Sequence, residues 1–294
     1  TILAAYLLDP TESGHELSDI AAALGVAGLA SDEAVYGKGA KFRLPDDPEQ
    51  LAAHIARKAR TAARVAPIQR EKLAEHGMEK LLFELELPLS GVLARMEKRG
   101  VKVDGEELRR YGEELSAAIA RLVRQIYEQA GMEFNLNSTK QLGEILFEKL
   151  GLPPVKKTKT GYSTDAEVLE KLAPYHEIVG NILHYRMLSK LQSTYVEGLS
   201  KEIRGGKIHT YYRQTIAATG RLSSQFPNLQ NIPIRTEEGR KLRKMFAPSE
   251  EGWLILSADY SQIELRVLAH ISGDARMKEA FVNDMDIHTK TAMD

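Results

Sequence analysis

The chain has 294 residues, of which 43% are hydrophobic and 28% charged, a balance typical of a folded protein that buries a core. It contains no cysteine, which excludes disulfides, thiolate catalysis and cysteine zinc sites. Its net charge is only −1, and no apolar run comes close to the ~20 residues that a membrane helix needs.

The first hundred residues predict helices divided by loops. Residues 1–50 alternate short helical runs with loops rich in Gly, Pro and Asp. Residues 51–78 predict an Ala- and Arg-rich helix that is interrupted near Pro67. Residues 79–99 predict a strongly apolar helix that Pro88 kinks.

The centre of the chain predicts long helices around a basic tip. A short extended link at residues 101–104 leads into the first of them. Helical patterns cover residues 105–130, 139–150, 165–172 and 176–199. Residues 155–163 read as a basic loop without apolar spacing. Long helices with a basic loop at the tip indicate a protruding arm rather than a compact bundle.

From Lys207 onward the pattern becomes extended. β-branched and aromatic residues predict one or two strands, followed by a polar loop and a short charged helix over residues 236–246. The apolar run at residues 253–256 predicts a buried strand. Asp259 then lies between that strand and a helix with one apolar stripe, Ile263, Val267, Leu268 and Ile271. A carboxylate held there suits a metal ligand, and a helix N-cap is the alternative.

The charge of the chain is segregated. Residues 135–247 carry 18 Lys and Arg against 10 Asp and Glu, a net of +8, whereas residues 248–294 have a net charge of −5. A basic middle beside an acidic end favours a surface that follows phosphates next to a cation site, although ordinary variation in surface charge is the alternative.

Two basic groups in the helical arm favour binding of a polyanion. One is the loop around residues 156–160, and the other is one ridge of the helix that contains residues 186–194. Their spacing suits sequence-independent, salt-sensitive phosphate contacts, and a solvated surface is the alternative. The candidate DNA-binding residues are Lys156, Lys157, Lys159, Arg186, Lys190, Ser193 and Thr194.

The loop at residues 219–231 is dense in hydrogen-bonding side chains of fixed reach. Amides can pair with base edges, and an arginine can reach two acceptors in a minor groove. Alternatively, these groups satisfy the backbone of their own loop. The candidates are Thr219, Arg221, Asn228, Gln230 and Asn231.

Three segments together resemble the palm of the bacterial family A DNA polymerases, of the DNA polymerase I type and most of all those of the Bacillus group. They are TGRLSS…PNLQNIPIR, ADYSQIELRVLAH and DIHTKTA. The arm sequences FNLNSTKQLGEILFEKLGLP, KKTKTGYST and YRMLSKLQSTY resemble the thumb of that family. The resemblance implies a mainly helical α+β fold with three parts. These are a remnant of a ribonuclease H-like exonuclease domain (1–78), a helical thumb (79–206) and the first part of the palm (207–294).

The same resemblance implies residue roles in template-directed DNA synthesis. Asp259 would be one of two aspartates that hold a pair of Mg²⁺ ions, with the backbone carbonyl of Tyr260 in the same shell. Glu264 would exclude a ribose 2′-hydroxyl, and His288 would lie near the incoming deoxynucleoside triphosphate. Arg221 would read the minor groove of the primer–template, with the loop amides beside it.

The chain also departs from the family pattern. Gln225 and Phe226 stand where a small hydroxyl residue and an acid are usual, and the effect of this change is open. In the exonuclease-like part, His54, Lys58 and Arg60 stand near where proofreading members carry metal-binding residues. Because cations cannot replace carboxylate ligands, we expect no proofreading.

The family's fingers and second metal aspartate would lie beyond Asp294, so we expect a truncated polymerase. On its own, this chain would bind DNA without synthesising it. Its compartment would be the bacterial cytoplasm, in association with the nucleoid. A DNA-binding module without catalysis and a related single-subunit RNA polymerase are the alternatives.

Overall fold

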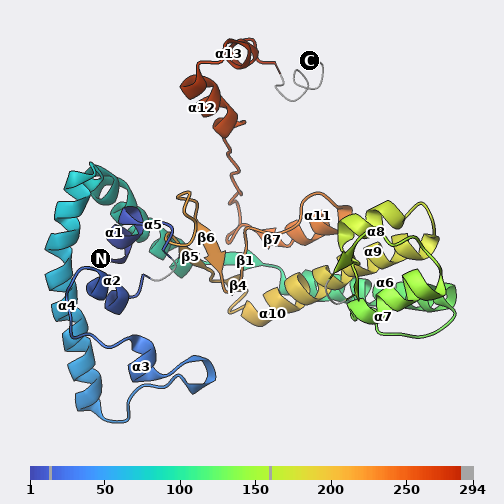
Figure 1. Cartoon of the computed structure of the whole chain (residues 1–294), viewed down its shortest axis with the longest axis horizontal. Helices are drawn as coiled ribbons and strands as arrows, with labels where there is room; N and C mark the ends of the chain where they lie inside the picture. Colours follow the sequence, from blue (N-terminus) through green and yellow to red (C-terminus); the bar gives the residue numbers. More distant parts are fainter. Residues whose placement is uncertain (13–14, 159–160, 286–294) are drawn as a thin grey trace. The chain divides into compact units, whose positions relative to one another are not determined.

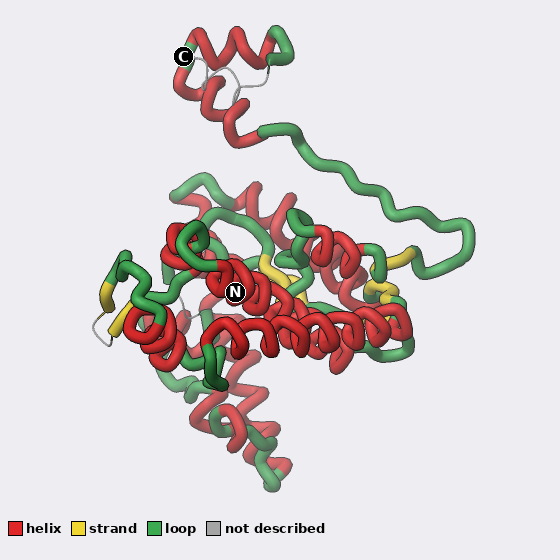
Figure 2. The backbone as a smooth tube through the Cα atoms, turned by 90° about the vertical axis from the view of Figure 1, so that its right-hand side faces the viewer, coloured by secondary structure: helices red, strands yellow, loops and turns green. Residues whose placement is uncertain are grey.

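The computed structural model describes residues 1–12, 15–158 and 161–285. The chain divides into two units, Thr1–Ser249 and Glu250–Asp294, which are described separately. Most of the described residues are helical and the strands are short (Figure 2), so the expected mainly helical α+β class is confirmed. No described helix combines the length and apolar character required to cross a membrane.

The first unit begins with helices that pack against one long helix. These are α1 (Ile2–Leu8), α2 (Leu17–Ala23), α3 (Asp32–Tyr36) and the long α4 (Pro48–Glu75), with a 3₁₀ turn at Gly39–Lys41. Val65 and Leu73 of α4 are fully buried against this layer. The predicted interruption at Pro67 is wrong, because α4 runs through it. The packed residues on either side hold the helix in place of the one hydrogen bond that proline removes.

A π-helical turn precedes Pro88. It spans Leu81–Glu86 and continues directly into α5 (Leu87–Arg99), where Pro88 occupies the first turn. Because proline lacks a backbone N–H and its ring crowds the preceding turn, a wider π-helical turn directly before Pro88 accommodates it within one continuous helical segment. The irregularity expected at Pro88 is therefore a change of helix type at residues 81–86.

A three-stranded antiparallel sheet follows α5. Its central strand β1 (Val101–Val103) pairs with β4 (Lys207–Ile208) on one side and β7 (Phe246–Ala247) on the other. Gly100 leads into β1 with φ +68°, and an added Cβ would lie 2.7 Å from the His209 ring. The predicted extended link is thus the middle of a sheet.

Between β1 and β4 lies a segment of helices that contains the largest core. Its elements are α6 (Gly105–Ala130), α7 (Thr139–Gly143), a π-helix at Glu144–Lys149, α8 (Ala166–Leu172), α9 (Glu177–Lys190), a π-helix at Leu191–Glu197 and α10 (Gly198–Glu202). In Figure 1, α6 and α9 run alongside each other, and both contribute to one core. Ile126, Leu146 and Ile182 are fully buried there, and truncating such a residue to alanine costs about 2–5 kcal/mol.

The basic segment after α7 is a hairpin rather than a loop. Strand β2 (Lys157–Thr158) pairs with β3 (Gly161–Tyr162) in antiparallel register. The expectation of a structureless loop is wrong because cross-strand backbone pairing forms here without an alternating apolar pattern. The Tyr162 ring packs on the helical arm, with its centroid 4.8 Å from that of Phe147.

A second hairpin and a short helix complete the first unit. Strand β5 (Tyr211–Arg213) pairs with β6 (Ser223–Gln225). The one or two strands expected from Lys207 onward are thus β4 and β5, and β6 lies within the polar loop. Helix α11 (Glu237–Arg243) is capped by Thr236 and leads into β7. The Tyr111 hydroxyl of α6 donates to the Glu238 carbonyl of α11 at 2.7 Å, and burial raises the pKa of Tyr111 to about 12.

The second unit contains α12 (Ile263–Ser272) and α13 (Ala275–Val282), which pack against each other. The buried strand predicted at residues 253–256 is wrong. These residues form no ladder with any described strand, and Leu254 and Leu256 are 89% and 91% exposed. A strand requires a partner for its backbone groups, and apolar composition cannot supply one.

Candidate nucleic-acid interface

The polar loop at residues 219–231 is built around two buried hydroxyls. Thr210 Oγ1 lies 2.7 Å from Ser224 Oγ, and the two residues are only 3% and 1% exposed. The Thr210 hydroxyl also lies 2.7 Å from the Pro227 carbonyl oxygen, and the Leu229 amide donates to Ser224 Oγ at 3.1 Å. Through these hydrogen bonds, Pro227 and Leu229 in the middle of the loop are held against Thr210 and against Ser224 of strand β6.

The side chain of Gln230 bridges two backbone groups of the same loop. Its Oε1 accepts from the Ser224 amide at 3.1 Å, and its Nε2 donates to the Leu222 carbonyl at 3.1 Å. Asn228 Oδ1 accepts from the Gln230 amide at 2.9 Å. The amides predicted to contact DNA are thus partly occupied in shaping their own loop, which was the alternative left open by the sequence.

The outer side of this loop presents the remaining candidates. Thr219, Arg221, Asn228 and Asn231 are exposed. The Asn231 carbonyl accepts a hydrogen bond from the Tyr195 hydroxyl, which fixes the loop to the helical arm. Arg221, Asn228 and Asn231 are therefore exposed on a loop whose backbone is fixed by buried hydrogen bonds.

The hairpin that carries the loop is fastened to α5. The Tyr212 amide donates to Glu97 Oε1 at 2.7 Å, and His209 Nδ1 donates to the Glu97 carbonyl at 2.7 Å. Burial, with a smaller contribution from the Glu97 carboxylate, raises the pKa of Tyr212. One glutamate thus accepts hydrogen bonds from two positions in the β4–β5 segment.

The candidates of the helical arm divide into two groups. Lys190, Ser193 and Thr194 are exposed around the junction of α9 and its π-helix. Arg186 is half-buried instead, and its guanidinium donates to the carbonyl and hydroxyl oxygens of Thr164. Burial lowers the pKa of Arg186, and the nearby Asp165 carboxylate offsets part of that effect. In this structure Arg186 therefore links α9 to the end of the β2–β3 segment.

Lys156 is exposed at the start of the β2–β3 hairpin. The backbone of Lys157 pairs with Tyr162. The Lys157 side chain, Lys159 and the nucleotide candidate His288 lie outside the described residues.

The predicted metal ligands lie in the second unit. Asp259 and Tyr260 are exposed on the extended segment before α12, and Glu264 is exposed in the first turn of α12. Among the described residues, no three His, Asp or Glu side chains gather as a metal site would require. The described part of the chain therefore does not by itself fit a two-ion magnesium centre.

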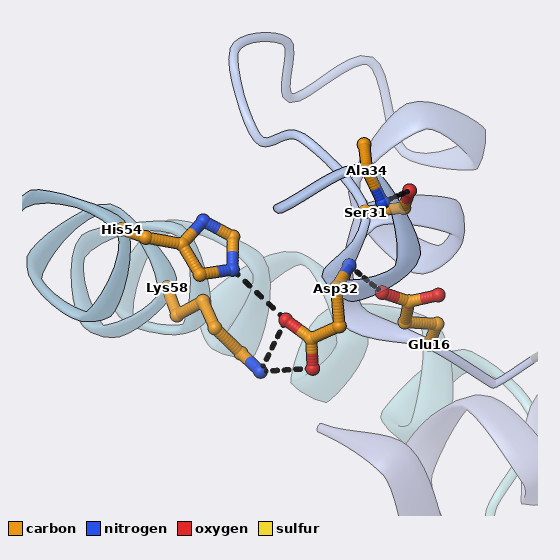
Figure 3. A network of polar contacts seen from close by, with 6 residues as sticks. All are labelled: Glu16, Ser31, Asp32, Ala34, His54 and Lys58. Atoms are coloured by element: carbon orange, nitrogen blue, oxygen red, sulfur yellow. Dashed lines mark hydrogen bonds and ion pairs between the residues drawn. The ribbon is translucent and has the colours of Figure 1, made fainter. Parts of the chain in front are cut away.

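The exonuclease-like part contains a separate polar network (Figure 3). Asp32 Oδ1 accepts from the buried His54 Nε2 at 2.9 Å, and the Lys58 ammonium lies 2.6 Å from Asp32 Oδ2. The hydrogen bond from Lys58, followed by that from His54, lowers the pKa of Asp32. The Asp32 carboxylate therefore ties α3 to α4 through one ion pair and one hydrogen bond.

Sequence reasoning missed the residues that hold the interface from beneath. Thr210 and Ser224 are small hydroxyl residues whose importance lies in burial. Tyr6 of the exonuclease-like part bonds the Ala217 carbonyl, and Glu86 of the π-helical turn before α5 bonds the Gln214 side chain, both across long distances in the sequence. One signal was present for Thr210, which is two residues after the buried Ile208 and so shares its strand face. No local pattern points to the others.

Comparisons with known proteins agree with this arrangement. A family model described as DNA polymerase family A matches residues 105–294, and one described as DNA polymerase I, ribonuclease H-like domain, matches residues 1–65. The chain is 57% identical to DNA polymerase I of Geobacillus stearothermophilus and 56% identical to that of Bacillus subtilis, over its whole length in both cases. It spans about a third (34%) of the length of each of these relatives.

A solved structure is similar over nearly the whole chain. It is the POL domain of Pol1 from M. smegmatis in complex with DNA primer-template and dNTP, with a TM-score of 0.84 and 38% sequence identity. The match covers 98% of this chain and 48% of that one. The resemblance noted in the sequence motifs is therefore confirmed, and the chain belongs to DNA polymerase family A.

Proposed function

We propose that this chain is the part of a DNA-directed DNA polymerase that holds the primer–template. The complete protein would add deoxynucleotides from triphosphates to a primer 3′ end under direction of a template. The observation that carries the proposal is the braced loop at residues 219–231, which exposes Arg221 beside two amides. The solved relative described with primer-template and dNTP supports the choice of ligand.

Within this proposal the residues have different tasks. Arg221, Thr219, Asn228 and Asn231 contact the minor groove at the primer end. Lys156, Lys157, Lys159, Lys190, Ser193 and Thr194 contact phosphates. Gln230 and Arg186 act mainly by shaping the surface, because their polar atoms already have partners in the chain.

The reacting centre is proposed to require residues that this chain does not contain. Asp259 and Tyr260 would contribute to a magnesium site, Glu264 would select against ribose, and His288 would contact the triphosphate. Because the described residues hold no three-ligand cluster, the isolated chain is expected to be inactive in synthesis. The carboxyl-terminal half of a family A polymerase would be its partner.

The same proposal includes three further points. The chain divides into three parts at residues 78 and 206, it has no proofreading activity, and the protein is located in the cytoplasm in association with the nucleoid.

Fluorescence anisotropy of a labelled primer–template tests the binding role. The isolated chain should raise the anisotropy at low salt, and the affinity should fall steeply as salt increases. Arg221→Ala should weaken binding. Absence of binding at low salt would contradict the proposal.

A DNA-binding module without catalysis is the second candidate. It is favoured because Asp259 belongs to no three-ligand cluster within the described part of the chain. Primer extension by a complete polymerase carrying Asp259→Ala separates the two. A polymerase should lose extension and keep its DNA affinity. A pure binding module would show no extension in either form.

A further inference from the structure

The residues between β5 and β6 form a turn that leads directly into Arg221. The Gly220 amide donates to the Ala217 carbonyl at 3.2 Å, which closes the turn, and Gly220 adopts φ +80°. Thr219 lies inside this turn and Arg221 follows it. The position of the Ala217 carbonyl therefore decides where both candidate DNA contacts lie.

A tyrosine of the exonuclease-like part reaches the same carbonyl. The hydroxyl of Tyr6, on α1, donates to the Ala217 oxygen at 2.6 Å. Tyr6 is 3% exposed, so water does not compete freely for this bond. A residue far from the loop in sequence thus holds the first carbonyl of the turn.

A second contact comes from the π-helical turn before α5. Gln214 Nε2 donates to Glu86 Oε2 at 2.7 Å and to the Glu86 carbonyl at 3.0 Å. Glu86 is only 9% exposed, and Gln214 directly follows strand β5. The segment between the strands is therefore held near both its beginning and its turn.

The two anchors belong to one packed body. Ala4 of α1, Leu73 of α4 and Leu82 of the π-helical turn form a single buried cluster. In Figure 1, α1 and α5 lie close to β5 and β6, as the hydrogen bonds require. Tyr6 lies on the same helix as Ala4, and Glu86 lies in the same π-helical turn as Leu82. The two residues that bond the loop segment are therefore carried by elements that pack together in this cluster.

We propose that the exonuclease-like part and the π-helical turn that follows it together act as a brace for the primer-end loop, with Tyr6 of the first and Glu86 of the second as positioning residues for Thr219 and Arg221. This would give a role in DNA synthesis to elements that lie far from the loop in the sequence. The identity of what the loop contacts rests on the proposed function. The brace itself rests on the hydrogen bonds alone.

Two tyrosine variants distinguish a local effect on the loop from a general loss of stability. Tyr6→Phe removes only the hydroxyl and keeps the ring contact with His15. Tyr127→Phe is a matched control, because the Tyr127 hydroxyl also donates to a backbone carbonyl, that of Phe134, at 2.8 Å within the helical arm. Hydrogen exchange followed by mass spectrometry should show faster exchange over residues 214–222 in Tyr6→Phe alone. Equal exchange in the two variants would overturn the brace.

The glutamate provides a conservative rescue. Glu86→Gln keeps an oxygen that accepts from Gln214 and should exchange like the parent chain. Glu86→Ala should loosen residues 214–222. If the alanine variant leaves this segment as protected as in the parent, Glu86 is not an anchor.

The effect on DNA is measured by anisotropy with a labelled primer–template. Tyr6→Phe should weaken binding about three- to tenfold, the range expected for one lost hydrogen bond, and Tyr127→Phe should not. In an Arg221→Ala background Tyr6→Phe should have a smaller effect on binding, because part of its effect acts through Arg221 and only the part that acts through Thr219 remains. Full additivity would overturn the positioning role. If the parent chain fails to bind DNA, the proposed function falls, and the exchange experiment still decides the brace.

Discussion

The side-chain oxygen of Gln230 accepts a hydrogen bond from the backbone amide of Ser224, and the side-chain nitrogen of Gln230 donates to the Leu222 carbonyl. Both polar atoms of this side chain therefore have partners within the loop. A residue type that is suited to reading base edges serves here as internal support. The neighbouring Arg221 and Asn231 remain exposed on the surface that this support creates.

The buried hydroxyl of Thr210 should be essential to that support. Thr210→Val keeps the shape but leaves Ser224 Oγ and the Pro227 carbonyl without this partner, which should cost about 1–3 kcal/mol. Thr210→Ser keeps the hydroxyl and should cost less. Urea unfolding of the two variants measures the difference, and equal stabilities would contradict the role of the hydroxyl.

Lys190 and Arg186 should separate binding from stability. Lys190→Ala should weaken DNA binding and reduce the magnitude of the salt slope by about 1, with the thermal midpoint unchanged. Arg186→Ala should lower the thermal midpoint, because Thr164 loses both of its contacts with the guanidinium. Anisotropy across a salt series and thermal unfolding test the pair. The reverse pattern would assign the phosphate contact to Arg186.

The Asp32 network predicts a dependence of stability on pH. Because the folded state lowers the pKa of Asp32 from 3.8, its contribution is present above that value and is lost as the pH falls below it. Asp32→Asn should therefore destabilise the chain at neutral pH, by less than about 1 kcal/mol since the carboxylate is partly exposed. The difference from the parent should shrink in acid.

Glu33→Gln is the control for this experiment. Glu33 follows Asp32 in α3, and its ion pair with Lys38 is exposed on both sides. Its substitution should leave the free energy of unfolding nearly constant over the same pH range. Urea midpoints between neutral pH and about pH 3 provide the comparison, and a constant Asp32→Asn deficit throughout would contradict the titration.

The single tryptophan reports on the second unit. Trp253 is 46% exposed on a segment without ladder partners. Its fluorescence should show the long-wavelength emission of a hydrated indole and strong quenching by acrylamide. Emission typical of a buried indole, with weak quenching, would indicate that residues 253–256 are covered in solution.

The sequence predicts elements well where local signals define them. Asp104 caps α6 through the Glu107 amide, Gly131 ends it in a left-handed conformation, and the predicted and observed bounds coincide at residues 105–130. Capping side chains and left-handed glycines act over a few residues, so they can be recognised in the sequence without knowledge of the tertiary structure.

Predictions fail where an element depends on a distant partner. The apolar run at residues 253–256 resembles a buried strand, yet no described strand pairs with it. Pro67 reads as a helix break, yet packing of Val65 and Leu73 carries α4 through it. In the candidate interface, the arginine and amide residues were predicted as DNA contacts from their chemistry, and the structure shows that they are exposed, while their role stays a prediction. The supporting contacts of Tyr6 and Glu86 were not, because they join segments far apart in the chain.

The position of β1 in the sheet has a consequence for the order of folding. Both of its neighbours, β4 and β7, come after the whole helical arm, and the Asp104 amide reaches the Met245 carbonyl at 2.9 Å. On a ribosome, β1 would emerge long before either partner. Since pairings between distant segments form late, the arm should fold first as a local unit and the sheet should close around its base afterwards.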